Sequence, residues 1–288
     1  MIEDFTPWNK YWDKKEMIDV PGRGQFNTYS TNATSKFVLI CVHGAGHSAL
    51  TFSLFASKLR DQFKIFAFDL KCHGDTPGDE AKDLGIESLV EDLVGFIKVV
   101  QPPDTHLIVM GHSLGGCIAA HAALKQHMSA IIVIDAIEGT AVESMPQMKN
   151  ILLQRPQYFT SPAEAIEYIA TSGEMMNIES AAVSSQGRLT EKDGAWFWKT
   201  DLMKCEKDWM GWFKGFADAF LKSTPYKVLV LPDINRLDTP FTIGHMSGKF
   251  QLEIILETNH CMQEDNPDGM AAIIVKLTKR LSTTHQWD

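Results

Sequence analysis

The sequence has few cysteines, and they form no familiar pattern. Its 288 residues include five: Cys41, Cys72, Cys117, Cys205 and Cys261. The number is odd, the spacing is wide, and no C-x-x-C pair occurs, whereas disulfide-stapled and zinc-stabilised domains depend on paired cysteines. We therefore expect buried free thiols, with neither a disulfide framework nor a structural zinc site.

Positive charge is also scarce. The chain has 27 Lys and Arg against 36 Asp and Glu, which gives a formal net charge of -9 at pH 7. Proteins that bind the phosphate backbone of nucleic acid or an anionic lipid surface need a basic face. The charge balance therefore argues against nucleic acid and membranes as partners.

Long apolar runs, repeats and flexible linkers are missing too. No run approaches the roughly 18 residues of a membrane helix, and the acidic start at Glu3 and Asp4 is unlike the basic n-region of a secretory signal. We expect an intracellular protein, located in the cytoplasm with the nucleus as a second compartment. Without a linker, residues 1–288 are predicted to form one domain.

The sequence does contain an alternation of apolar runs and helical patterns. Before residue 140 it has four short apolar runs, typical of strands buried on both faces: 37–42, 63–68, 106–110 and 130–134. A helical pattern over 86–97, with apolar residues three and four apart, lies between the second and third runs. This alternation predicts an α/β fold with a mainly parallel central sheet flanked by helices.

The alternation stops between residues 140 and 222, where the sequence becomes helical and rich in Met and Trp. Strand patterns resume at 228–231 and 250–256, and residues 267–281 predict a closing amphipathic helix. We therefore predict a helical cap, 140–222, inserted within one domain. Its Met and Trp residues fit two interpretations equally: an apolar substrate surface, or the cap's own core.

The motif with the most chemical content is Gly111-His112-Ser113-Leu114-Gly115-Gly116. It follows a predicted strand and precedes a helical pattern at 117–125, which is the context of a nucleophile elbow. Ser113 would occupy a strained turn, and the glycines two positions to either side would let neighbouring backbone approach. The motif predicts a nucleophilic serine; a glycine-rich turn with an inert serine is the alternative.

A second glycine-rich turn, residues 43–47 (HGAGH), follows the first buried strand. Backbone N–H groups of such a turn can stabilise the oxyanion of acyl transfer. We predict the N–H of Leu114 as one donor and that of Ala45 or Gly46 as the other, and the sequence leaves that choice open. The histidines of this turn share no helical face and have no carboxylate nearby, so we predict no metal site.

The general base is expected after the last predicted strand, where residues 257–260 (ETNH) end in His260. The other histidines weighed for this role are less well placed: His112, His121, His245 and His285. The acid is open between Asp233 or Asp238, after the strand that follows the cap, and Asp135, at the tip of the strand after the nucleophile. Neighbouring strand tips lie about 5 Å apart, so either position could reach the histidine.

At these residues the chain resembles the protein phosphatase methylesterase family. Its members are serine hydrolases of the α/β-hydrolase fold that demethylate the C-terminal leucine of the type-2A phosphatase catalytic subunit. The resemblance covers almost the whole chain. The glycine loop and the elbow are common to many esterases, whereas residues 135–141 (DAIEGTA), 236–238 (RLD) and 248–251 (GKFQ) are more particular to this family.

The resemblance implies that Asp135 rather than Asp238 is the acid, so that Ser113, Asp135 and His260 form a catalytic triad that needs no cofactor. It also implies two contacts with the type-2A phosphatase catalytic subunit. The C-terminal tail would enter between core and cap as the substrate, and the body would dock and remodel the site. Two features depart from the family: Asn259 stands where members have glycine, and the cap loop at 187–195 is short where members can carry a long acidic one.

Two other functions are compatible with this fold. One is a small-molecule esterase or lipase, and the other is a catalytically silent module that binds the phosphatase. The family-particular segments argue against the first, and the intact set of Ser113, Asp135 and His260 argues against the second.

Overall fold

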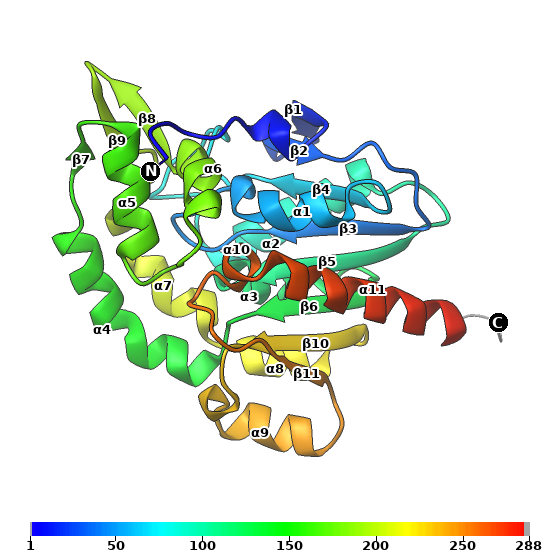
Figure 1. Ribbon diagram of the computed structural model, residues 1–288. Helices are drawn as coiled ribbons and strands as arrows, with labels where there is room; N and C mark the ends of the chain where they lie inside the picture. The colour runs from blue at the N-terminus through cyan, green and yellow to red at the C-terminus, as the bar shows by residue number, and fades with distance from the viewer. Residues whose placement is uncertain (1, 285–288) are drawn as a thin grey trace.

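The computed structural model describes residues 2–284 and is built around an eight-stranded sheet (Figure 1). Its strand order is β1-β2-β4-β3-β5-β6-β10-β11. The bounds are β1 (Lys14–Val20), β2 (Gly24–Ser30), β3 (Phe37–Val42), β4 (Lys64–Phe68), β5 (His106–His112), β6 (Ala130–Ile134), β10 (Tyr226–Leu231) and β11 (Gln251–Ile254). β2 runs antiparallel to β1 and β4, and all other neighbours are parallel. The predicted α/β fold is confirmed.

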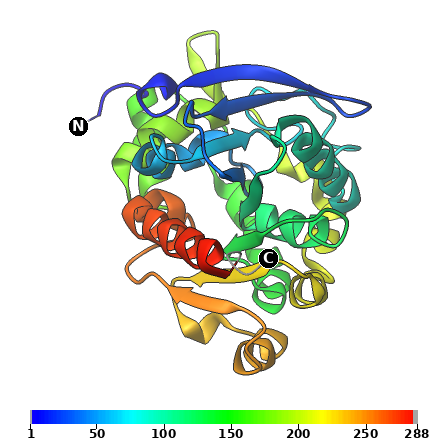
Figure 2. The same ribbon diagram turned by 90° about the vertical axis from the view of Figure 1, so that its right-hand side faces the viewer.

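Helices cover both faces of this sheet (Figure 2). One face carries α1 (Ser53–Leu59) and α11 (Pro267–Thr284), and the other carries α2 (Ile86–Val100), α3 (Leu114–Ala122) and α8 (Phe216–Lys222). In β3, Leu39 and Cys41 join the first core, while Val38, Ile40 and Val42 join the second. Because both faces are buried, the strand reads as an unbroken apolar run.

The hairpin of β1 and β2 was not predicted from the sequence. β1 is the edge strand, and most of its side chains are exposed or half-buried, so it carries no continuous apolar run. All five cysteines are buried and free, as expected. Within residues 2–284, no helix is both long enough and apolar enough to span a membrane.

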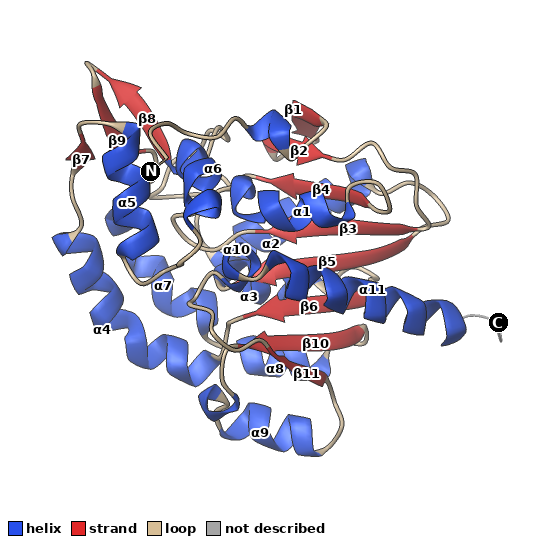
Figure 3. Cartoon of the chain, viewed as in Figure 1, coloured by secondary structure: helices blue, strands red, loops and turns tan. Residues whose placement is uncertain are grey.

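The segment that follows β6 lies over the carboxyl ends of the strands (Figures 1 and 3). It contains α4 (Glu138–Gln154), α5 (Pro162–Thr171), α6 (Ile178–Arg188), η3 (Leu202–Cys205) and α7 (Glu206–Phe213). It also contains a small antiparallel sheet, which the expectation of a purely helical cap missed: β7 (Tyr158–Phe159), β9 (Ala195–Trp198) and β8 (Leu189–Lys192). Trp196 and Trp198, expected in helices, lie in β9.

A sequence signal for this hairpin exists. Asp193 and Gly194 join β8 to β9, and both have positive φ, 51° and 79°. Asp-Gly is a preferred pair for the tight hairpin turn in which both central residues have φ above zero. Trp209 and Trp212 pack into the core beside α3, and the Trp212 indole N–H donates to the carbonyl of Leu84 at 2.6 Å. These two tryptophans therefore serve packing.

The remaining elements are short, apart from α9. They are η1 (Trp8–Lys10), η2 (Ala49–Phe52), η4 (Ile234–Arg236), α9 (Thr239–Met246) and α10 (Met262–Asp265). η4 and α9 follow β10, and α10 follows the loop after β11. The loops after β3, β5, β6, β10 and β11 all open at the carboxyl edge of the parallel strands, where catalytic groups of α/β sheets gather.

Candidate active site

Ser113 lies in the sharp turn between β5 and α3, with φ 51° and ψ -119°. This backbone conformation is strained for a residue with a side chain. A Cβ added to Gly111 would lie 2.1 Å from the carbonyl oxygen of Gly115, and one added to Gly115 would lie 2.1 Å from that of Val42. The glycines of the motif are therefore sterically required, and the turn has the geometry of a nucleophile elbow.

His260 follows β11 and points one ring nitrogen at Asp135. Its Nδ1 lies 2.7 Å from Oδ2 of Asp135, which stands at the tip of β6 with φ 47°. The Asp135 side chain is fully buried, whereas the His260 side chain is 39% exposed. The carboxylate accepts the Nδ1 proton, and this leaves Nε2 as the unprotonated nitrogen.

Arg236, the last residue of η4, holds the same carboxylate. Its Nη1 lies 2.6 Å from Oδ1 and 2.7 Å from Oδ2 of Asp135. Burial by itself would raise the pKa of this carboxyl, but the hydrogen bond from His260 and the charge of Arg236 more than offset burial and lower the pKa. Asp135 is therefore ionised near neutral pH.

The two competing aspartates make other contacts. Asp238 accepts hydrogen bonds from the backbone N–H groups of Phe241 and Gly139, at 3.1 and 3.0 Å, and begins α9. Asp233 accepts from the N–H of Asn235 and begins η4. Both act as helix caps. Of the three candidate acids, only Asp135 contacts His260.

The other histidines have structural surroundings. His112 is buried, its ring lies 4.6 Å from the ring of His260, and its Nε2 donates to the His260 carbonyl at 3.0 Å. His245 packs on Phe250, and burial lowers the pKa of His121. His285 lies outside the described residues. His112 thus supports the loop of His260, a role that its position beside the nucleophile did not reveal.

The glycine turn after β3 approaches the elbow closely, since a Cβ on Gly44 would lie 3.2 Å from the Cβ of Ser113. The N–H of Gly46 is already used, because it donates to Nε2 of His73 at 2.9 Å. Within the described part of the chain, the N–H groups of Ala45 and Leu114 donate to no protein atom. Both amides are therefore free to bind a substrate oxygen.

His73 was not identified from the sequence as part of the site. Its Nδ1 lies 2.8 Å from the carbonyl of Lys71, so Nδ1 donates and Nε2 can accept from Gly46. Burial lowers the pKa of His73 to about 3, which keeps the ring neutral and able to accept. Only the fold brings together two residues that are 27 positions apart.

No hydrogen bond joins Ser113 to His260 in this structure. Among the described residues, the Ser113 hydroxyl makes no hydrogen bond to the His260 ring. The structure therefore brings together Asp135 and His260, and separately the elbow and the glycine turn, without the final link between nucleophile and base.

Three buried side chains beside this site offer donor atoms to a metal ion, all within 4.8 Å of one another: His47, His112 and Cys261. Burial raises the pKa of the Cys261 thiol well above its usual value and lowers the pKa of both histidines. The neutral groups pack together, with Sγ of Cys261 3.8 Å from Nε2 of His47. Ester hydrolysis by a serine nucleophile needs none of them as metal ligands.

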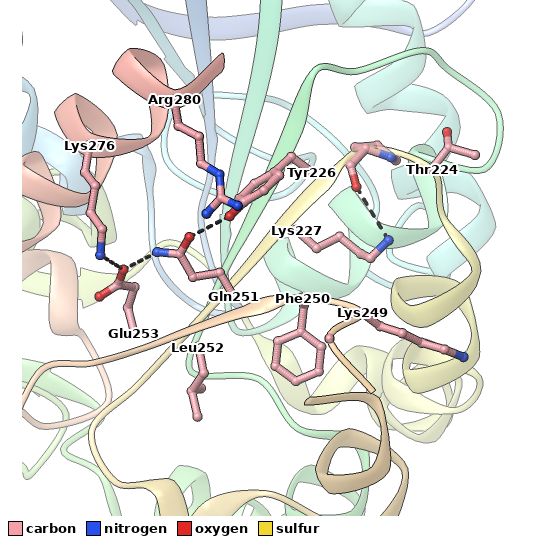
Figure 4. Close-up of a pocket in the computed structure, with 12 residues that line it drawn as sticks. Thr224, Tyr226, Lys227, Lys249, Phe250, Gln251, Leu252, Glu253, Lys276 and Arg280 are labelled. Carbon is pink, nitrogen blue, oxygen red and sulfur yellow. Dashed lines mark hydrogen bonds and ion pairs between the residues drawn. The ribbon is translucent and has the colours of Figure 1, made fainter. Parts of the chain in front are cut away.

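A surface pocket lies away from Ser113 and His260 (Figure 4). It has a volume of about 710 Å³ and is lined by the starts of β10 and β11 and by α11, including Tyr226, Gln251 and Arg280. β10 and β11 are parallel to β5, so this pocket opens at the amino ends of the strands. Ser113 lies at the other end of the sheet, and the pocket contains none of the candidate catalytic residues.

The sequence matches known proteins along most of its length. A sequence model of the alpha/beta hydrolase family matches residues 39–273. Protein phosphatase methylesterase 1 of Homo sapiens is 33% identical, with 94% of this chain and 84% of that protein covered. The protein of the same name from Schizosaccharomyces pombe is 35% identical, with 96% and 86% covered. A probable protein phosphatase methylesterase 1 of Caenorhabditis elegans is 35% identical, with 92% and 74% covered.

Solved structures share the fold at lower identity. E-2-(acetamidomethylene)succinate hydrolase superposes with a TM-score of 0.78 at 18% identity and covers 92% of this chain and 99% of its own. The thioesterase domain from the curacin biosynthetic pathway superposes with a TM-score of 0.71, also at 18% identity, with 91% and 99% covered. The fold, the family match and the near-complete alignment with methylesterases agree: the chain belongs to the protein phosphatase methylesterase family and is a carboxylic ester hydrolase of the α/β-hydrolase fold.

Proposed function

We propose that this protein is a serine carboxylesterase that removes the methyl ester from the C-terminal leucine of the type-2A protein phosphatase catalytic subunit. The observation that carries the proposal is the hydrogen bond between His260 and the buried Asp135 beside the Ser113 elbow. It occurs in a chain whose relatives, aligned over most of their length, are named protein phosphatase methylesterases.

In the proposed mechanism, Nε2 of His260 takes the proton of the Ser113 hydroxyl as Oγ attacks the ester carbonyl. The N–H groups of Ala45 and Leu114 bind the oxyanion, and the protonated histidine gives its proton to the departing methoxide, which leaves as methanol. Water, deprotonated by the same histidine, then cleaves the acyl-enzyme and releases the free carboxylic acid. Asp135 keeps the proton on Nδ1 throughout and stabilises the imidazolium.

The missing hydrogen bond between Ser113 and His260 is part of the proposal. We expect docking of the phosphatase body to bring Nε2 of His260 within hydrogen-bond distance of Ser113 Oγ, since catalytic hydrogen bonds often tighten only in the substrate complex. The triad residues also bracket the cap: Ser113 and Asp135 precede residues 140–222, and His260 follows them. Residues 1–288 would therefore function as one domain, and the intracellular location stays a prediction.

The decisive experiment incubates the protein with methylated phosphatase and reads the mass of the C-terminal peptide. We expect loss of the methyl group with the native chain and none with Ser113→Ala. If the methyl group persists while simple esters are cleaved, the methylesterase proposal is wrong and the protein is a small-molecule esterase. If a fluorophosphonate probe fails to label Ser113 even with phosphatase present, the protein is a binding module and the catalytic proposal is wrong.

A further inference from the structure

Two loops of the site attach to one element of the cap, the segment from Glu174 through α6 to Arg188. The glycine turn carries the amide proposed to bind the oxyanion, and the loop after β11 carries His260. The loop of His260 is held at the amino end of α6, and the glycine turn is held at its carboxyl end.

At the amino end of α6, the contacts lie on both sides of His260. The N–H of Cys261 donates to the carbonyl of Glu174 at 2.9 Å. The Asp265 carboxylate accepts from the N–H of Asn259 at 2.7 Å and, with its other oxygen, from the N–H of Met176 at 2.6 Å. The residues immediately before and after His260 are thus tied to the cap, one of them through Asp265.

A second tie reaches the same loop from α6. The side-chain amide of Asn177 and the hydroxyl of Ser180 both donate to the carbonyl of Glu264, each at 3.0 Å. Asn177 is also the N-cap of α6, since its side-chain oxygen accepts from the N–H groups of Glu179 and Ser180. The residue that begins the helix therefore also holds the short α10 that follows His260.

At the carboxyl end of α6, Arg188 holds the glycine turn. Its Nε donates to the carbonyl of Gly46 at 3.2 Å, and its Nη1 donates to the Glu174 carboxylate at 2.9 Å. The Arg188 side chain is 4% exposed. A Cβ on Gly187 would lie 2.0 Å from Oγ of Ser48, so the helix also packs directly against the residues after the turn.

The ion pair of Glu174 and Arg188 closes the chain of contacts. Burial alone would raise the pKa of Glu174, but the charge and hydrogen bond of Arg188 outweigh it and lower the pKa. An ionised pair therefore links the turn, through Arg188 and Glu174, to the N–H of Cys261. If one loop moves, the other must follow or the hydrogen bonds of Arg188, Glu174 and Cys261 break, and unpaired buried polar groups are costly.

We propose that Glu174, Asn177, Arg188 and Asp265 are positioning residues, and that α6 acts as a clamp that sets the spacing of His260 and the oxyanion amides. This inference rests on the proposed serine esterase function. A partner that moves α6 changes the alignment of base and oxyanion donors together, which places control of the site in the cap.

The test uses variants that cut one tie each. Asn177→Ser keeps a capping hydroxyl but loses the donor to Glu264, and Asp265→Asn replaces one acceptor oxygen by a donor. Ser161→Ala is the matched control, because Ser161 is the N-cap of α5 in the same cap and, among the described residues, its side chain has no hydrogen bond to either loop. Arg188→Lys keeps a cation for Glu174 but loses the planar fork that also reaches Gly46.

We expect kcat on a simple ester to fall about 10- to 100-fold for Asn177→Ser and Asp265→Asn, with KM within about 2-fold, because misplacement of a catalytic group acts on the chemical step. Ser161→Ala should keep the native kcat. The proton on Nδ1 of His260, observed by NMR, should stay sharp in the control and broaden or shift in the two variants. Arg188→Lys should lower kcat while it preserves that resonance.

Thermal unfolding of each variant separates misfolding from misalignment. The clamp is refuted if the variants and Ser161→Ala share one kcat and one His260 resonance while all are folded. The resonance is measured without turnover, so it tests the clamp even if no ester is cleaved. Cleavage of simple esters without demethylation of the phosphatase contradicts the proposed substrate. The kcat values of the variants on a simple ester and their His260 resonances still decide whether the clamp exists.

Discussion

The contacts of Asp135 make a specific prediction for Asp135→Asn. Arg236 lies 2.6 to 2.7 Å from both carboxylate oxygens, and it needs an acceptor. The single oxygen of the asparagine would therefore turn to Arg236, and its NH₂ would face Nδ1 of His260. The imidazole would then carry its proton on Nε2, where it cannot accept the proton of Ser113.

The expected loss in kcat is about 10⁴, as for removal of the orienting acid in other Ser-His-Asp enzymes. At about 1.36 kcal/mol per factor of ten, this corresponds to about 5 kcal/mol of activation free energy. KM should change little because Asp135 is buried behind His260. Asp238→Asn is the control: asparagine caps a helix about as well as aspartate, so the change should cost little stability and keep kcat within a few-fold of the native value.

A double variant tests the reasoning further. In Asp135→Asn combined with Arg236→Met, nothing compels the amide oxygen to face away from His260, so it can accept the Nδ1 proton and restore the productive tautomer. We expect the double variant to be faster than Asp135→Asn alone. Steady-state rates on one ester decide the matter: a double variant as slow as the single refutes the tautomer argument, and a large loss for Asp238→Asn with a small one for Asp135→Asn gives the role to Asp238.

Other predictions concern stability and packing. Burial raises the pKa of Glu264 to about 8, so the native state holds a proton that the unfolded chain releases above its usual pKa of 4.5. As the pH rises from 4.5 to 8, the Glu264 carboxyl should therefore lower the free energy of unfolding, by about 5 kcal/mol in total. Urea titrations at several pH values measure this loss, and Glu264→Gln should not show it. Burial lowers the pKa of His43 to about 4 and of His73 to about 3. Below pH 6.5 the two histidines bind protons in the unfolded chain but stay neutral in the folded protein, so each should lower the free energy of unfolding by about 2 kcal/mol at pH 5. A free energy of unfolding that does not change between pH 6.5 and 5 would contradict this. Gly115→Ala should prevent folding or abolish activity, because its Cβ would lie 2.1 Å from a β3 carbonyl, whereas Gly211→Ala in α7 has open space and should raise the melting temperature.

Local patterns predicted the elements whose causes are local. The apolar run of β3 reflects burial on both faces, and the elbow around Ser113 follows from glycines that the turn itself requires. The position of His260 after the last strand follows from chain order. These features depend on neighbouring residues in the sequence, so the sequence was sufficient to place them.

Features that depend on distant contacts could not be predicted in this way. Whether Ala45 or Gly46 offers a free N–H depends on His73, which takes that of Gly46 from a loop after β4. The hairpin of β8 and β9 was missed for a different reason: each strand has only four residues, and the Asp-Gly turn between them was its one strong signal.

The competition between Asp135 and Asp238 shows why residue type alone could not identify the acid. The N–H of Gly139 donates to Asp238, and the hydroxyl of Thr140 donates to the carbonyl of Arg236, so residues 135–141 and 236–238 bind each other. Arg236 in turn binds Asp135. Asp238 thus supports the loop that holds the acid's partner, and a carboxylate in either position fits the pattern of the sequence. Only the direction of the His260 ring distinguishes the residue that contacts the base from the residue that supports its surroundings.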